Sequence, residues 1–196
     1  MIMHRVLTRV LLLSLLAGAF QGEPASSLTE KVKAELGLMY YDNPPPIEKK
    51  LLELGDAKSI TAVLIDLATR SRDAEPPGLE RLYLIESVFA LGKFKATEAL
   101  PLLKDLVKSR DTELRVYTVQ AIAQIDAKGS RGLLLQSLGD ENFAVRRAAA
   151  EGLATTNDPA ILTELEVQAS REQFRDTFQA IQALADAMRS RMAKSK

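Results

Sequence analysis

The sequence predicts an all-α fold built from a repeated helical unit, and three observations support this prediction. A pattern of small and large apolar residues recurs four times at a constant step along the chain. Apolar residues elsewhere recur at helical spacing, and short segments rich in Gly, Pro and Asp separate these stretches. The composition, 46% hydrophobic and 27% charged, is ordinary for a folded domain. Because helix pairs of this kind bury their apolar faces against neighbouring pairs, the expected architecture is an α-solenoid.

The clearest copy of the repeat runs from Asp140 to Leu153. Its last five residues have small side chains at the first and fourth places and a large apolar side chain at the fifth. The four copies in this register are Ser87–Leu91, Thr118–Ile122, Ala149–Leu153 and Ala180–Leu184. Agreement at four places is not expected by chance, so these residues are predicted to form the buried ladder between stacked helices.

Residues 1–19 have the order of a secretory signal peptide, with cleavage expected after Ala19. Arg5 and Arg9 precede an apolar run over residues 10–20, which is shorter than the roughly 20 residues needed to span a bilayer. An uncleaved amphipathic or membrane-anchoring helix is the alternative. The chain is therefore expected to be exported, periplasmic or secreted, without membrane insertion after cleavage.

Four segments are expected along the chain. They are the signal peptide (1–19), a flexible lead-in (20–27), N-terminal capping helices (28–55), and the helical repeats with a C-terminal capping helix (56–196). The helices are predicted from Leu28, at 47–54, from Asp56 to about Arg72, around 82–91, at 99–109, 114–125, 133–138, 143–153 and 161–169, and from about Arg171. Ser27, with Glu30 three residues later, is expected to cap the first.

Two segments allow a second interpretation. The three prolines of residues 44–46 suit the start of a new helix, but they could also form a polyproline ligand for a partner. The basic end after Arg189 suits the negative pole of a helix and the polar cap of a solenoid. It could instead be an interaction tail.

The repeat at Asp140–Leu153 resembles the second half of a HEAT-like repeat, in particular the short type first noted in phycobiliprotein lyases. The residues that carry the resemblance are Asp140, Val145, Arg146, Ala149, Ala150 and Leu153. It covers roughly Ala57 to Met188 and implies a right-handed α-α superhelix of antiparallel helix pairs. By resemblance, Asp111 with Arg115 and Asp140 with Arg146 would stitch neighbouring turns together. Leu84 and Thr177 occupy the arginine position in the outer copies, so this ladder is expected only in the middle two.

The chemistry available to the chain is narrow, since it has no Cys and its single histidine, His4, lies in the expected signal peptide. Histidine bases, Ser-His and Cys-His nucleophile pairs and Cys/His zinc sites are therefore excluded from the processed chain. Paired carboxylates such as Glu164 with Glu166, or Asp140 with Glu141, are a weak alternative. No catalytic residue, metal site or cofactor is predicted. The equal totals of 26 basic and 26 acidic residues disfavour nucleic acid as a partner.

The second helices of successive units are expected to line a concave binding face. In the register of the repeat, its two rows are Glu86, Tyr117, Ala148 and Gln179, and Phe89, Gln120, Glu151 and Gln182. Tyr117 and Phe89 are candidate aromatic anchors for a partner, although Phe89 could simply pack against the next unit. The six candidate partner-binding residues are Glu86, Phe89, Tyr117, Gln120, Arg147 and Glu151. Arg147 and Glu151, which are four residues apart, could instead form an exposed ion pair with each other.

The first functional hypothesis is an exported, non-catalytic module for protein binding or scaffolding. The identity of its protein partner and its oligomeric state are left open. The second hypothesis, suggested by the lyase-type repeats alone, is an accessory enzyme or a chromophore-handling protein. A fixed structural part of a larger envelope assembly is the third.

Overall fold

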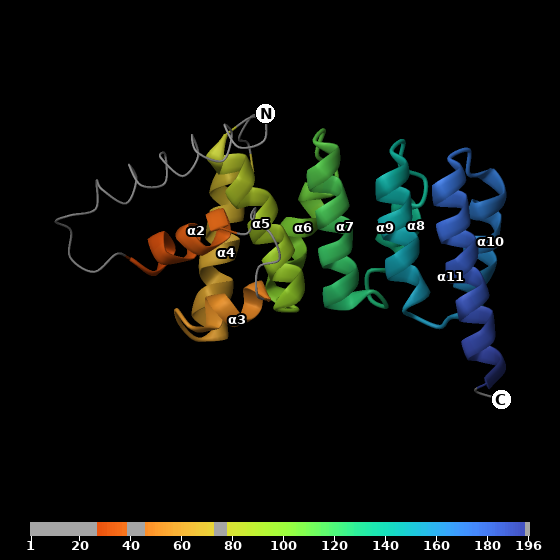
Figure 1. Ribbon diagram of the computed structural model, residues 1–196, viewed down its shortest axis with the longest axis horizontal. Helices are drawn as coiled ribbons and strands as arrows, with labels where there is room; N and C mark the ends of the chain where they lie inside the picture. Colours follow the sequence, from red (N-terminus) through yellow and green to blue (C-terminus); the bar gives the residue numbers. More distant parts are fainter. Residues whose placement is uncertain (1–26, 39–45, 73–77, 195–196) are drawn as a thin grey trace, which may run out of the picture.

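A computed structural model of the chain describes residues 27–38, 46–72 and 78–194 (Figure 1). These residues form α-helices and one short 3-10 helix, without a β-strand among them. The predicted all-α fold is confirmed, because the helices follow one another in pairs along the long axis of the molecule. The expected signal peptide and most of the lead-in lie outside the described residues, as do Pro44 and Pro45.

Two short helices contact the first helix pair at the N-terminal end. Helix α2 (Leu28–Leu38) begins after Ser27, whose hydroxyl accepts a hydrogen bond from the Glu30 N–H at 3.4 Å. This is the cap that the sequence predicts. Pro46 directly precedes α3 (Ile47–Leu52), where the missing N–H of a proline removes no helical hydrogen bond. The buried side chains of α2 and α3 pack towards α4 and α5.

Four helix pairs follow in the described part of the chain. They are α4 (Ala57–Ser71) with α5 (Leu79–Lys93), α6 (Leu100–Leu106) with α7 (Thr112–Asp126), α8 (Arg131–Ser137) with α9 (Phe143–Ala154), and α10 (Pro159–Arg171) with α11 (Arg175–Lys194). The second helices α5, α7, α9 and α11 contact one another in sequence and carry most of the packing between units. The face of the solenoid formed by these helices is thus continuous from α5 to α11 (Figure 1).

Some helix boundaries differ from the prediction for identifiable reasons. The predicted helix 99–109 starts with a 3-10 turn, Thr97–Ala99, and α6 ends at Leu106. The last helix begins at Arg175 rather than near Arg171, because Glu172 has extended backbone and accepts hydrogen bonds from the N–H groups of Gln173 and Phe174. Helix α9 is capped by the Asn142 side chain, while Asp140 accepts a hydrogen bond from the Asn142 N–H.

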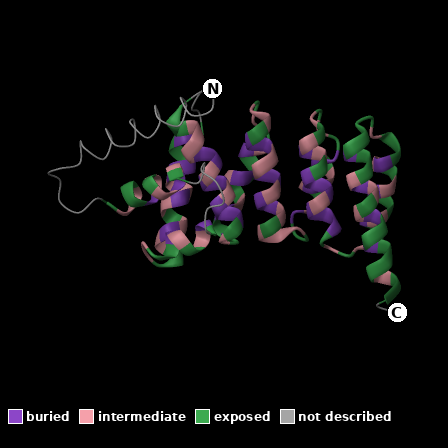
Figure 2. Cartoon of the chain, in the orientation of Figure 1, coloured by how far each residue is buried: buried purple, intermediate pink, exposed green. Residues whose placement is uncertain are grey.

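The predicted ladder forms the core of the first three repeats. Leu91, Ile122 and Leu153 are each 0% exposed, whereas Leu184 in the fourth copy is only partly buried. Ala183 in that copy is exposed. The reason is that α11 packs through a narrower stripe of Thr177, Ile181, Ala185 and Met188. The end of α11 after this stripe is largely exposed (Figure 2).

Two glycines allow the second helices to approach closely. A Cβ atom added at Gly92 in α5 would lie 2.8 Å from the Cα of Ala121, and one added at Gly152 in α9 would lie 2.4 Å from the Cβ of Ala123. Both distances are too short for two carbon atoms in contact. The α5–α7 and α7–α9 packing therefore requires glycine at these places.

Candidate functional site

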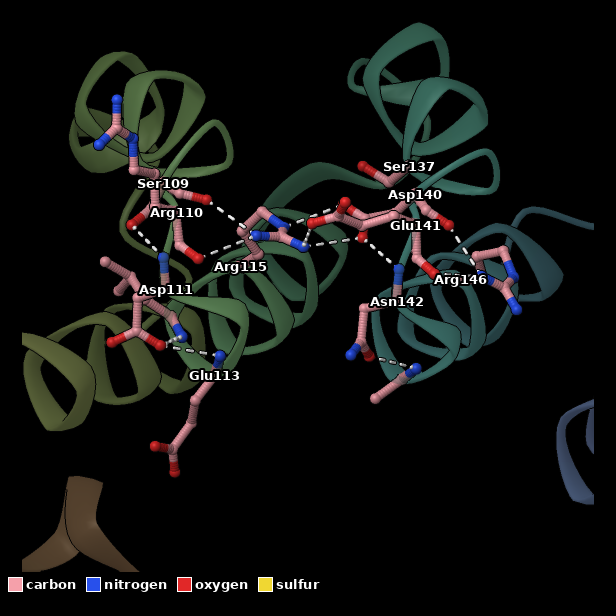
Figure 3. Close-up of polar contacts among 12 residues, drawn as sticks. Ser109, Arg110, Asp111, Glu113, Arg115, Ser137, Asp140, Glu141, Asn142 and Arg146 are labelled. Carbon is pink, nitrogen blue, oxygen red and sulfur yellow. Dashed lines mark hydrogen bonds and ion pairs between the residues drawn. The ribbon is translucent and has the colours of Figure 1, made fainter. Parts of the chain in front are cut away.

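Arginine side chains on the second helices bind the connections of neighbouring units. Arg115 on α7 is 6% exposed, and its guanidinium donates two hydrogen bonds of 3.0 Å to the carboxylate of Asp140 in the next unit. A third bond, also 3.0 Å, goes to the carbonyl oxygen of Ser109 in its own unit (Figure 3). One side chain thus joins the α6–α7 connection to the α8–α9 connection.

The same arrangement occurs one unit further along. Arg146 on α9 donates two hydrogen bonds of 2.7 Å to the carboxylate of Glu172 and one of 2.8 Å to the carbonyl oxygen of Asp140. The Glu172 side chain is 0% exposed. Each arginine therefore contacts the backbone of its own unit and a carboxylate of the next. Asp111 accepts hydrogen bonds from the N–H groups of Glu113 and Leu114 in its own unit, and it is also bound by an arginine of the preceding unit.

That arginine is Arg81, which the sequence did not predict. Its guanidinium contacts Asp111 at 2.6 Å and Glu113 at 2.6 Å. Leu84 does occupy the expected arginine position, but Arg81 lies one helical turn earlier on the same face of α5. Within the described residues, these ion pairs form a ladder from α5 to the start of α11. We refer to Arg81, Arg115 and Arg146 as the arginine ladder.

The ladder controls the ionisation of its carboxylates. Arg146 lowers the pKa of Glu172, because its hydrogen bonds outweigh the opposing effect of burial. Burial by itself would raise the pKa of Asp111, but the hydrogen bonds from Arg81 and from the N–H groups at the start of α7 lower it overall. Both groups are therefore held in the charged form that binds arginine.

A groove lies beside the ladder, between α7 and the start of α9. It has a volume of about 570 Å³ and is lined by Thr112, Glu113, Val116, Tyr117, Gln120, Asn142, Phe143 and Ala144. Tyr117 and Gln120 are two of the predicted partner-binding residues. Phe89 contacts Tyr117 edge to face, with the ring centroids 6.0 Å apart, so it packs against the next unit as the alternative interpretation proposed.

The other residues predicted for the binding face do not line this groove. Ala148, placed in the exposed row by the sequence, is only 2% exposed, because α9 is buried over most of its length. Arg147 and Glu151 form an exposed ion pair of 2.9 Å, as the sequence allowed. Gln179 is exposed and Gln182 partly buried on α11. Of the predicted partner-binding residues, Tyr117 and Gln120 line the groove at the α7–α9 junction.

Two exposed phenylalanines extend this surface, and the prediction missed both. Phe143 is 43% exposed and Phe174 is 52% exposed, and their ring centroids lie 4.9 Å apart. The guanidinium of Arg146 lies 5.9 Å from the centroid of Phe174. Because Phe174 follows Phe143 by one full step of the repeat, the register could have identified them. We call Phe89, Tyr117, Phe143 and Phe174 the aromatic row.

Glu86 is the unusual carboxylate of this surface. It is partly buried on α5, one turn before Phe89. Burial raises its pKa to about 7, and the negative charge of Glu113 contributes to the shift. Within the described residues no cation forms an ion pair with it, because Arg81 is bound to Asp111 and Glu113.

The carboxylate pairs considered for catalysis lie in ordinary surroundings. Asp140 is bound by Arg115, and Glu166 by Arg189, while Glu164 is exposed. In the described part of the chain, no three His, Cys, Asp or Glu side chains gather in a way that could hold a metal ion. A helix long and apolar enough to cross a membrane does not occur in residues 27–38, 46–72 or 78–194.

The stacked helix pairs and the arginine ladder define an α-solenoid. A family model described as HEAT repeats matches residues 101–185, and one described as PBS lyase HEAT-like repeat matches residues 84–109. The chain is a HEAT-like repeat protein, as the resemblance in the sequence indicated. No curated protein showed significant similarity to the chain.

Proposed function

We propose that this chain is an exported, non-catalytic module that binds another protein through the α7–α9 groove and the aromatic row. The observation that carries the proposal is the exposure of Phe143 and Phe174 next to a groove lined by Val116 and Tyr117. Aromatic side chains that pack against a partner provide much of the binding energy of protein interfaces.

The arginine ladder supports this proposal because it holds the surface in a fixed shape. Arg115 and Arg146 both bind Asp140 and Glu141, and so fix the connection that directly precedes Asn142 and Phe143. A surface that is already ordered loses less conformational entropy when a partner binds. Export rests on the pattern of residues 1–19, so the partner would be a protein of the envelope or the exterior.

Site-specific photo-crosslinking in the native compartment tests this function. A photoreactive amino acid replaces Gln120, which lines the groove, or Glu164, which is exposed on α10. We expect one defined protein to be captured from position 120, to be absent from position 164, and to be lost when Tyr117 is also changed to Ala. Capture of the same proteins from both positions, or of none, contradicts the proposal.

Fractionation of the same cells tests the location. We expect the protein outside the cytoplasm, with a new N-terminus at Phe20. A full-length protein in the cytoplasm would contradict export while leaving the groove assignment open to the crosslinking result.

A further inference from the structure

Two carboxylates, those of Glu86 and Glu113, lie near the α5 end of the aromatic row. Glu86 and Phe89 lie one turn apart on α5, and Phe89 contacts Tyr117, which lines the groove. Glu113 also lines the groove, and its charge acts on Glu86. A ligand in the groove therefore contacts Glu113, Tyr117 and Phe143, and Phe89 and Glu86 lie beyond Tyr117 on α5.

The cations of this surface are already engaged. Arg81 is bound to Asp111 and Glu113, and Arg147 pairs with Glu151 at 2.9 Å. The Lys93 ammonium lies 5.1 Å from the centroid of the Phe89 ring. Glu86 is consequently the group whose charge this part of the chain leaves uncompensated. A charge in such a place costs free energy unless a ligand supplies the counter-charge.

We propose that the α7–α9 groove and the aromatic row bind a polypeptide segment in which an apolar anchor residue is followed closely by an arginine. The anchor lies between Val116, Tyr117 and Phe143, and the arginine reaches Glu86 across Phe89. This inference rests on the proposed function and specifies the chemistry of the partner.

Arginine suits this place for two reasons. Its planar guanidinium forms two parallel hydrogen bonds with a carboxylate, and its flat face stacks on aromatic rings. The raised pKa of Glu86 adds a consequence, because arginine binds the charged carboxylate. Binding must therefore strengthen as pH rises through about 7 and must release a proton from Glu86.

Defined synthetic peptides test the proposal by fluorescence anisotropy with the purified protein. Four pools of peptides of about a dozen residues combine a Phe or Ser anchor with an Arg or Glu, at all short spacings. We expect the Phe–Arg pool to bind about fivefold or more tighter than the Phe–Glu and Ser–Arg pools, and the Ser–Glu pool to bind weakest. Equal binding of the Phe–Arg and Phe–Glu pools overturns the proposal.

Variants assign the effect to residues. Glu86→Gln is expected to weaken binding of the Phe–Arg pool about fivefold at about pH 8 and to abolish the increase in affinity between about pH 6 and about pH 8. Tyr117→Ala is expected to weaken it about tenfold. The matched controls Glu164→Gln and Val167→Ser change exposed residues of α10 and are expected to bind like the wild type. A pH dependence that persists in Glu86→Gln contradicts the role of Glu86.

The two proposals can fail separately. If the peptide pools show no preference but crosslinking from position 120 still captures a protein in a Tyr117-dependent way, the arginine-bearing segment is wrong and protein binding stands. If neither peptides nor a cellular protein bind, both are wrong.

Discussion

At the scale of single residues, two arginines that are adjacent in the sequence have different roles. Arg146 and Arg147 are neighbours in sequence, yet the first contacts a fully buried carboxylate and the second an exposed one. Removing one partner of a buried pair leaves the other charge without compensation, whereas solvent screens an exposed pair. The two arginines therefore form a matched comparison.

We expect Arg146→Gln to lower the free energy of unfolding by about 2–3 kcal/mol. Arg147→Gln should change it by less than about 0.5 kcal/mol. Urea denaturation followed by circular dichroism measures both values on the same protein. Equal losses from the two variants would show that the Glu172 contact does not stabilise the fold.

Unlike the Arg146–Glu172 pair, Glu86 is expected to destabilise the folded state when its carboxyl is ionised. Its pKa rises from 4.5 to about 7 on folding, so the folded state favours the protonated carboxyl. The stabilisation is complete below about pH 4.5 and is lost as pH rises through about 7.

Glu86→Gln should therefore melt at a higher temperature than the wild type at about pH 8, by an amount equivalent to roughly 1 kcal/mol after solvent screening. At about pH 4 the two proteins should melt together. Thermal melts at both pH values measure this, and a constant difference across the range would assign the effect to packing instead of ionisation.

At the scale of helices, close approach determines which residue types the repeat tolerates. Gly152 faces Ala123 across the α7–α9 contact, and Gly92 faces Ala121 across the α5–α7 contact. The pattern in the sequence predicted small residues at these helix contacts. It could not show that one methyl group is already too large, since that depends on the distance between two helices.

Gly152→Ala should destabilise the protein by about 1–3 kcal/mol, although alanine is the better helix former. The control is Gly132→Ala in α8, where an added Cβ has no atom within 4 Å. This control should be neutral or gain up to about 1 kcal/mol. Chemical denaturation of both variants measures the difference, and a stable Gly152→Ala would mean that α9 can move away from α7 without cost.

The N-terminal cap of α7 was predicted correctly from the sequence. Asp111 accepts hydrogen bonds from the N–H groups of Glu113 and Leu114, as a capping residue before an apolar stretch should. The start of α11 at Arg175, in contrast, was not predicted from the sequence. Its position depends on Glu172, which is held by Arg146 from 26 residues earlier in the chain. Local pattern contains no information on such a contact.

At the scale of the whole molecule, stability should be distributed along the solenoid, because each unit contacts mainly its neighbours. Loss of a contact at one end is then expected to loosen that end while the other end keeps its protection from hydrogen exchange.

In hydrogen exchange monitored by mass spectrometry, Arg146→Gln should accelerate amide exchange in α10 and α11 several-fold. Peptides from α4 and α5 should exchange at the wild-type rate. Uniform acceleration throughout the chain would instead indicate that the protein unfolds as one cooperative unit.

By itself, the sequence determined the all-α class, the register of the repeat and most helix starts, because these depend on periodic burial and on capping residues that are local in the chain. Only the tertiary structure decided which arginine binds which carboxylate, that Ala148 is buried, and that a groove lies at the α7–α9 junction. These features depend on distances between residues that are far apart in sequence. Such distances are fixed only when the helices have packed.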